Sequence, residues 1–433
     1  MSDLIQPKVL KGFRDFLPEE EIFRADLVEK LTGTYRSYGF VPIDTPILEY
    51  TEILLRKSNG ETEKQVFRFE DNGHRDVAMR FDLTVPFARF TAEHKEELYF
   101  PFKRYHIAKV WRGEKPQAGR YREFVQCDFD TVGSDSATSD FETLALMKAA
   151  LKAIGVEKVT IHVNHRGIFN RFLKQIGASE NSEDILRIVD KLAKVGSEEV
   201  TKELADVTGS KESALKILEY IQPEEDFTST LTHIEKLAGG EDSDTKRLKD
   251  IYAMMCASGI EGSYVLDPSI TRGLDYYTGV VYETFLDDLP GIGSVCSGGR
   301  YDNLAGLYMK DKVPGVGASI GLDRLIAGLT ELGLTSKKGS YLDAEIYNSN
   351  EDHVIYYQKI ASLLREKGVS VEVFPDTVKM AKQYNLTEKK NIPWGILVSE
   401  EDVKNNTFTL KNLKTREQFT SLNAEEAAEK ILK

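Results

Sequence analysis

The sequence predicts an α+β fold, in which an antiparallel sheet with flanking helices is interrupted by a helical insertion and followed by a C-terminal α/β domain. Three observations predict it. The runs 98–111 and 121–132 are extended and flank a loop containing proline and glycine, which is typical of a long antiparallel hairpin. Residues 170–262 carry apolar side chains at helical spacing without a clear strand pattern. Beyond the polar linker 335–341, strand-like and helix-like runs alternate.

The composition is that of a globular protein. The chain has 433 residues, a formal net charge of −13 and 41% hydrophobic residues, which excludes a mainly disordered chain, a collagen-like repeat and a disulfide scaffold. No run of 18 apolar residues occurs, and residues 1–13 lack the pattern of a secretory signal. We therefore expect a cytoplasmic protein that does not enter a membrane, with three reduced cysteines.

The first part of the chain predicts one helix before the hairpin and one after it. Apolar residues recur at helical spacing over 19–38, and Gly39 follows in the place of a C-cap glycine. Helical spacing returns over 138–154, after the second strand of the hairpin. We therefore expect these two helices to flank the sheet.

The later elements follow from the same patterns. The insertion, with 12 basic and 19 acidic residues, predicts helices with solvated faces. Extended runs resume at 263–267, 279–286, 294–298 and 315–320, and the last leads into a helical pattern over 322–332. After the linker, the alternating strand-like and helix-like runs are 343–347, 352–367, 369–374, 378–385, 394–398 and 424–432.

Residues 103–123 are the strongest local departure from the acidic total. They contain seven basic and two acidic residues. A solvated hairpin face explains this charge, but an anion site explains it as well, because the planar guanidinium of arginine binds phosphate oxygens with two hydrogen bonds. Charge alone leaves both interpretations open.

The common nucleotide-binding and hydrolase motifs are absent from the sequence. There is no GxxxxGK[ST], HExxH or GxSxG, and no kinase signature. The run GVGASIG at 315–321 differs by one residue from the dinucleotide fingerprint and lacks its acidic partner, so we reject a Rossmann site. If a nucleotide binds, arginines on a β-surface must hold it.

Two short segments combine glycine with polar and aromatic residues. RGLDYYTG (272–279) places an arginine, an aspartate and two tyrosines before a strand, and SGGRYD (297–302) places a glycine pair before Arg300 and Tyr301. A glycine pair permits close approach of a ligand to the backbone, but it is equally typical of a simple turn.

Taken in order, these segments resemble one family, the histidyl-tRNA synthetases, over nearly the whole chain. The segments that carry the resemblance are GFRDFLP (12–18), YGFVPIDTPILE (38–49, class II motif 1), KVWRGEKPQAGRYREFVQCDFD (109–130, motif 2), GVGASIGLDRL (315–325, motif 3), RGLDYYTG and SGGRYD. The resemblance implies a catalytic core of class II type in 1–169 and 263–334, a helical insertion in 170–262 and an anticodon-binding domain in 341–433.

The resemblance also implies the residues that would bind ATP. Arg112 would bind the α-phosphate and Arg324 the triphosphate tail, while Glu114 would face the adenine edge and Phe124 would stack on its ring. Arg120 would lie near the phosphates or the tRNA end, and Arg272 resembles the family's catalytic arginine beside the α-phosphate. No residue is assigned as a metal ligand, although Mg²⁺ is expected to accompany ATP.

For histidine, the resemblance implies two groups of residues. Asp82, Thr84 and Gln126 would receive the α-ammonium, and the imidazole pocket would be lined by Asp130, Tyr276, Tyr277 and Tyr301, with Arg272 nearby. Many bacterial members carry glutamate where this chain has Asp82 and Asp130, whereas eukaryotic-type members carry aspartate. The charge is therefore kept on a side chain that is one methylene shorter.

The activity implied is histidine–tRNA ligation, with ATP, L-histidine and tRNA(His) as substrates and a homodimer as the expected assembly. Because the carboxylate of histidine is already ionised, attack on the α-phosphate needs positioned cations and no general base. The alternative is a non-catalytic paralogue, the histidine-sensing regulatory subunit of ATP phosphoribosyltransferase. That paralogue typically lacks the anticodon-binding domain and parts of the arginine and histidine signatures, which this chain retains.

Overall fold

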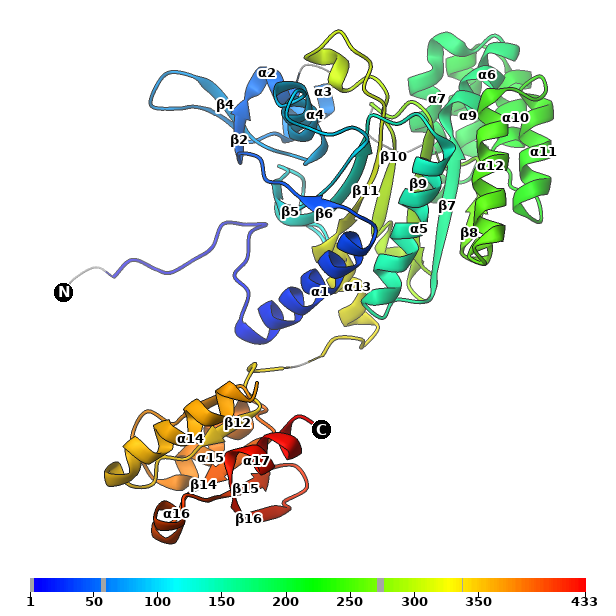
Figure 1. Cartoon of the computed structure of the whole chain (residues 1–433). Helices are drawn as coiled ribbons and strands as arrows, with labels where there is room; N and C mark the ends of the chain where they lie inside the picture. Colours follow the sequence, from blue (N-terminus) through cyan, green and yellow to red (C-terminus); the bar gives the residue numbers. More distant parts are fainter. Residues whose placement is uncertain (1–3, 56–59, 271–275, 337) are drawn as a thin grey trace. The chain divides into compact units, whose positions relative to one another are not determined.

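The structure is a computed structural model that describes residues 4–55, 60–270, 276–336 and 338–433 (Figure 1). The chain forms two compact units. One comprises Met1–Arg14 with Leu27–Leu334, and the other comprises Asp15–Asp26 with Thr335–Lys433. The predicted α+β class is confirmed, while the domain limits at 169, 262 and 334 remain predictions. In the described part of the chain, no helix is both long and apolar enough to cross a membrane.

The first unit is built on an eight-stranded sheet. Six adjacent strands are antiparallel, and a short parallel pairing is added at each side. In sheet order the strands are β1 (Val41–Pro42), β5 (Phe102–Trp111), β6 (Glu123–Val132), β11 (Gly315–Gly321), β10 (Cys296–Arg300), β9 (Val280–Leu286), β7 (Val159–His165) and β8 (Tyr264–Leu266). The predicted hairpin is confirmed as β5 and β6, whose ten residues pair in unbroken register.

Helices and a small second sheet complete the core of this unit. The helices are α2 (Thr51–Leu55), α3 (Gly60–Gln65), α4 (Thr84–Glu93), α5 (Ala137–Ala153), α13 (Leu322–Glu331) and the part of α1 (Pro18–Ser37) from Leu27 onward. The second sheet has the order β2 (Leu48–Tyr50), β4 (Asp76–Met79), β3 (Arg68–Glu70). The helices predicted over 19–38, 138–154 and 322–332 are confirmed as α1, α5 and α13. Both α5 and α13 pack against β6 and β11, which are neighbours in the sheet.

The insertion is helical, as its apolar spacing indicates. Its helices are α6 (Arg166–Gln175), α7 (Ser182–Val189), α8 (Leu192–Val195), α9 (Ser197–Thr208), α10 (Lys211–Tyr220), α11 (Phe227–Leu237) and α12 (Ser243–Ala257) (Figure 1, green). Capping residues begin several of them: the side chain of Ser210 caps α10, Asp226 caps α11 and Asp242 caps α12. Arg247 of α12 forms an ion pair with the buried Asp140 of α5 at 2.7 Å, which fixes the insertion to the core.

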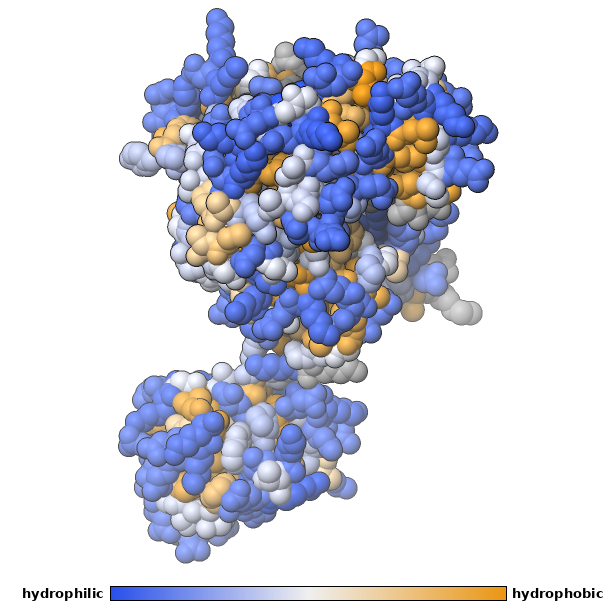
Figure 2. Space-filling view, turned by 90° about the vertical axis from the view of Figure 1, so that its right-hand side faces the viewer, coloured by the Kyte–Doolittle hydropathy of each residue, from blue (hydrophilic) through white to orange (hydrophobic). Residues whose placement is uncertain are grey.

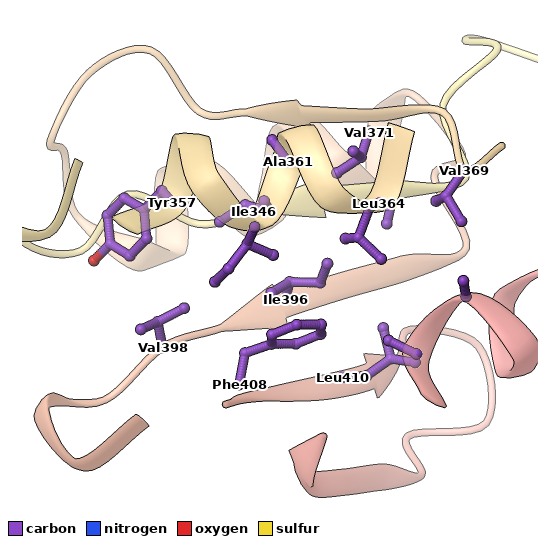
Figure 3. Packing of buried hydrophobic residues seen from close by; sticks show 14 residues of the cluster. Ile346, Tyr357, Ala361, Leu364, Val369, Val371, Ile396, Val398, Phe408 and Leu410 are labelled. Carbon is purple, nitrogen blue, oxygen red and sulfur yellow. The ribbon is translucent and has the colours of Figure 1, made fainter. Parts of the chain in front are cut away.

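The second unit contains a mixed five-stranded sheet with helices, in agreement with the predicted α/β pattern. Its strands, in sheet order, are β13 (Val371–Val373), β12 (Ala344–Ile346), β14 (Trp394–Leu397), β15 (Phe408–Asn412) and β16 (Gln418–Leu422), and its helices are α14 (Val354–Glu366), α15 (Met380–Lys389), α16 (Glu400–Asn405) and α17 (Ala424–Ile431). Ile346, Leu364, Ile396 and Phe408 lie in one apolar cluster that holds α14 on the sheet (Figure 3).

Hydrophilic residues cover most of the molecular face in Figure 2, and hydrophobic residues gather there only in separate small patches.

The described 3₁₀ segments are short connections: η1 (Ser179–Asn181), η2 (Glu261–Ser263), η3 (Pro290–Ile292), η4 (Ala305–Leu307) and η5 (Glu351–His353).

Candidate active site

The β6 strand carries the site on one face and the core on the other. Because successive side chains of a strand point to opposite faces, Phe124, Gln126, Asp128 and Asp130 share one face. The opposite face includes Phe129, which is fully buried with its ring centroid 5.0 Å from that of Tyr35. One strand therefore positions four of the site residues on one face while its other face packs into the core.

Two adjoining cavities lie over this face of the sheet. The first has a volume of about 280 Å³ and the second about 220 Å³. All five residues predicted to bind ATP line the first cavity, namely Arg112, Glu114, Arg120, Phe124 and Arg324. Of the residues predicted to bind histidine, Asp82, Thr84, Gln126, Asp130, Tyr276 and Tyr277 line the second. The predicted sets are thus brought together as two neighbouring groups, which meet at Arg112 and Gln126.

Backbone carbonyls hold two arginines in place in the first cavity. Nε of Arg112 donates to the carbonyl oxygen of Phe81 at 2.9 Å, and its guanidinium carbon lies 5.1 Å from the centroid of the Phe124 ring. Nη1 of Arg324 donates to the carbonyl oxygen of Ser294 at 2.8 Å. Neither contact uses a carboxylate, so the positive charge of both side chains stays available to an anion.

Three arginines, Arg112, Arg120 and Arg324, line this cavity. Burial lowers the pKa of the Arg324 guanidinium first, and the nearby charges of Arg120 and Arg112 lower it further, while Glu114 raises it. Glu114 and Arg120 form an ion pair at 3.3 Å. A cavity where cations repel one another is suited to a polyanionic ligand, because that ligand relieves the repulsion.

One wall of the first cavity is closed by a contact between distant segments. Arg14, in the GFRDFLP segment, forms an ion pair with Asp323, which also accepts a hydrogen bond from the backbone N–H of Val125 at 2.7 Å. The Arg14 guanidinium lies 3.5 Å from the centroid of the Tyr121 ring. The motif-like segments near residues 14, 121–125 and 323 are thereby joined in space.

The second cavity is rich in buried carboxylates. Asp82 accepts hydrogen bonds from the backbone N–H of Val85 at 3.1 Å and the hydroxyl of Tyr276 at 3.3 Å. Burial nevertheless raises the pKa of Asp82 to about 6. Burial likewise raises the pKa of Asp128 to about 7, with the neighbouring Asp130 adding to the rise. Such carboxyl groups favour a cationic ligand, which restores their charged form.

Asp130 is held by one buried cation and one phenol. The guanidinium of Arg104, which has no exposed surface, forms an ion pair with Asp130 at 2.7 Å, and the Tyr301 hydroxyl donates to Oδ1 of Asp130 at 2.6 Å. Tyr301 does not line the cavity itself. Any influence of Tyr301 on a ligand would therefore act through its hydrogen bond to Asp130. Burial raises the pKa of Asp130, and the charge of Arg104 opposes that rise.

Glycines beside these groups make room for side chains. A Cβ atom on Gly299 would lie 2.8 Å from the Tyr277 ring, so the absence of a side chain there lets the ring pack on β10. The glycine pair of SGGRYD therefore lies within a strand, and the interpretation of this pair as a simple turn is wrong. The physical reason is that Gly298 and Gly299 pair with both neighbouring strands.

The basic segment is only partly an anion site. Of its seven cations, Arg112 and Arg120 line the first cavity. Arg104 is buried against Asp130, Lys103 pairs with Glu142, Lys109 pairs with Glu123, and Arg122 donates to backbone carbonyl oxygens. The charge count overestimates the site, because carboxylates or backbone carbonyl oxygens already bind these other four side chains.

Arg272 lies outside the described residues, so its predicted place is not described. Other residues enter the site that the sequence analysis did not assign: Arg104, Asp128, Glu283, Ser297 and Ser319. Asp128 could have been found from the sequence, because it lies two residues from both Gln126 and Asp130 and so shares their face of the strand. Three other residues that line the cavities lie next to one another across neighbouring strands: Glu283, Ser297 and Ser319. The sequence alone does not reveal how these strands pair.

The family comparisons agree over both units. Residues 12–325 match the model of histidyl-tRNA synthetase, and residues 343–433 match the model of the anticodon binding domain. The chain is 65% identical to the histidine–tRNA ligase of Treponema denticola over 407 residues, which cover 93% of this chain and 91% of that protein. It is 54% identical to that of Treponema pallidum, covering 100% and 99% of the two chains.

A solved structure supports the same relationship. The crystal structure of histidyl-tRNA synthetase from Nostoc sp. PCC 7120 superposes with a TM-score of 0.89 at 30% identity, and it covers 99% of both chains. The similarity therefore includes both compact units and the segments between them.

Proposed function

The chain belongs to the histidyl-tRNA synthetase family, and from that premise we propose that the first cavity binds ATP and the second binds histidine. The reaction is histidine–tRNA ligation. Histidine is activated with ATP to histidyl-adenylate and pyrophosphate, and is then transferred to the 3′-terminal adenosine of tRNA(His) with release of AMP. The regulatory-subunit alternative is not favoured, because the identity to ligases extends over the whole chain.

One observation carries the proposal: the two cavities share a wall. Arg112, Gln126, Glu283, Ser297 and Ser319 line both of them. The histidine carboxylate and the α-phosphate of ATP must meet at such a junction, since the new bond joins these two groups. Arg112 lies on this wall, where its charge would offset the repulsion between the two anions.

On the ATP side, the lining of the first cavity supports the roles assigned to these residues. Arg112 would bind the α-phosphate and Arg324 the triphosphate tail. Phe124 would stack on adenine while Glu114 would contact its edge, and Arg120 would lie near the phosphates or the tRNA end. Arg272 is proposed as the second catalytic arginine on the basis of its sequence motif alone.

On the histidine side, Asp82, Thr84 and Gln126 would receive the α-ammonium. Asp130, Tyr276 and Tyr277 would form the imidazole pocket, and Tyr301 would act on it through its hydrogen bond to Asp130. A site whose buried polar groups are satisfied by the substrate strongly rejects apolar analogues, because those groups would be left without partners. The raised pKa values of Asp82 and Asp128 support a cationic substrate in this cavity.

Mg²⁺ is proposed as the companion of ATP. Among the described residues there is no group of three or more metal-ligating side chains. We propose that the triphosphate would supply most of the ligands of the ion. Glu283, whose carboxylate lines both cavities, has the oxygen chemistry to hold it. When bound, the ion would neutralise charge on the phosphates.

The remaining proposals concern assembly and location. We infer a homodimer formed through the segment that resembles motif 1, in a cytoplasmic protein. Four apolar residues in this segment or directly beside it each expose more than two-fifths of their surface: Val41, Ile47, Leu48 and Tyr50. Together with a hollow of about 770 Å³ lined by Pro42 to Ile47 and β5, they form a surface suited to a second copy.

ATP–pyrophosphate exchange with each of the twenty amino acids tests the proposal. Exchange with histidine alone is expected, and Arg112→Ala should abolish it while leaving the protein folded. A folded protein that binds histidine but supports no exchange would indicate the regulatory-subunit function instead. Aminoacylation of tRNA(His) then tests the second step, and light scattering at micromolar concentration tests the dimer.

A further inference from the structure

Asp128 lies in the second cavity without a role in the proposed reaction. It is on the cavity face of β6 between Gln126 and Asp130, and only 1% of its surface is exposed. A buried carboxylate is costly unless it serves a partner or a ligand. Its neighbours therefore indicate what it does.

The side chains of Gln126, Ser319 and Asp128 form a small network. Nε2 of Gln126 donates to Oγ of Ser319 at 2.8 Å and to Oδ1 of Asp128 at 3.4 Å. The Ser319 hydroxyl in turn bonds to the Asp128 carboxyl. In the charged form that a cationic ligand restores, the Asp128 carboxylate can only accept hydrogen bonds, so it requires the nitrogen of the Gln126 amide, and not its oxygen, to face it.

This orientation leaves the oxygen of the same amide without a protein partner. Oε1 of Gln126 is buried, and no donor among the described residues contacts it. The residue is 8% exposed and lines both cavities. Buried acceptors are almost always paired in folded proteins, so this oxygen is suited to a donor that arrives with a ligand.

The charges around Asp128 indicate the nature of that donor. Asp82, Asp128 and Asp130 all line the second cavity. The buried Arg104 is shared between Asp130 at 2.7 Å and Asp128 at 3.9 Å, so a single guanidinium offsets two carboxylates. A ligand group that donates hydrogen bonds and carries positive charge satisfies both the Gln126 oxygen and this excess of negative charge.

We propose that Asp128 is a positioning residue for substrate recognition: with Ser319 it fixes the Gln126 amide so that its oxygen accepts from the α-ammonium of histidine. This inference rests on the proposed function of the second cavity. The competing explanation is that Asp128 only neutralises Arg104, in which case it would contribute nothing that depends on the ammonium.

Asp128→Asn separates these explanations. It keeps the size of the side chain, but the new amide group can donate a hydrogen bond, so the Gln126 amide can rotate and exchange the positions of its oxygen and nitrogen. Two competitive inhibitors of histidine-dependent exchange serve as probes. Histidinol has the ammonium and the imidazole, whereas 3-(imidazol-4-yl)propionate lacks the ammonium. We expect the inhibition constant of histidinol to rise about tenfold or more, and that of the propionate by less than about twofold. The KM for ATP should stay within about twofold of the unsubstituted protein.

Equal weakening of both inhibitors, or no weakening of either, would overturn the proposal. Asp184→Asn on α7, an exposed site in the insertion, is the matched control and should change neither constant. If Asp128→Asn does not fold, Ser319→Ala carries the test, because it removes the hydroxyl that links Gln126 to Asp128; the same selective loss is expected. Failure of the proposed function itself would be visible separately, as the absence of histidine-dependent exchange in the unsubstituted protein.

Discussion

Oδ1 of Asp130 lies directly over Gly317 on the neighbouring strand, so close that a Cβ atom at residue 317 would be 2.0 Å from it. The two residues are register partners of β6 and β11. The glycine thus provides the space in which the carboxylate meets Arg104 and Tyr301.

Gly317→Ala is expected to displace Asp130 and to raise the KM for histidine at least about tenfold, while the KM for ATP changes little. Overpacking of this kind also costs about 1–3 kcal/mol of unfolding free energy. Steady-state exchange kinetics and urea denaturation measure the two effects. Gly306→Ala, where an added Cβ would meet no atom within 4 Å, is the control. Equal effects of both substitutions would contradict the argument.

Asp130→Ala should impair histidine recognition far more than ATP binding. The substitution removes the partner of Arg104 and Tyr301 inside the second cavity and leaves the first cavity intact. Exchange assays that vary each substrate in turn give the two KM values. An unchanged KM for histidine would show that Asp130 does not belong to the histidine pocket.

Asp82→Asn should stabilise the ligand-free protein at pH 8 and weaken histidine binding. The folded-state pKa of Asp82 is raised to about 6, so between pH 4 and 6 the folded state holds a proton that the unfolded state has lost. The free energy of unfolding therefore falls as the pH rises from 4 to 6. Above pH 6 the total loss amounts to about 3 kcal/mol at most. Asparagine carries no charge and avoids that loss.

The corresponding measurement is urea denaturation of both proteins at pH 8 and at pH 4. The advantage of Asp82→Asn should be present at pH 8 and nearly vanish at pH 4, where the aspartate is protonated in the folded state. An advantage of the same size at both pH values would refute the explanation by charge burial.

Arg324→Gln should raise the KM for ATP about tenfold or more and leave the KM for histidine within about twofold. The reason is that Arg324 lines the first cavity only, with its charge held beside those of Arg112 and Arg120. Stability should not fall greatly, since the substitution also removes repulsion between these cations. A matched rise in both KM values would mean that the cavities are not separate in function.

Much of the fold could be predicted because local patterns determine it. The hairpin of β5 and β6 and the helices α1, α5 and α13 each have an apolar spacing that matches their burial. The strand β7 is missing from the prediction, although Val159, Ile161 and Val163 alternate with polar residues and are buried. The strands β15 and β16 are also missing, since they are five residues long and largely polar.

The site residues that lie on one strand could be predicted from the sequence. Those that come together only through the pairing of different strands could not. Phe124, Gln126 and Asp130 lie on one strand, so their shared face follows from sequence. The row of Glu283, Ser297, Ser319 and Asp128 exists only through the pairing of four strands. The burial of Arg104, likewise, follows from its opposite neighbour Asp130 and not from its own charged surroundings in the sequence.

The strand order has a consequence for synthesis of the protein. β11 is the last strand of its sheet to leave the ribosome, yet it lies between β6 and β10 at the centre. Until residue 321 has emerged, the nascent sheet consists of two halves with unpaired edges, which are prone to associate with other chains. Both cavities also have walls on β11, so a chain arrested before that strand would hold most of its core and neither complete binding site.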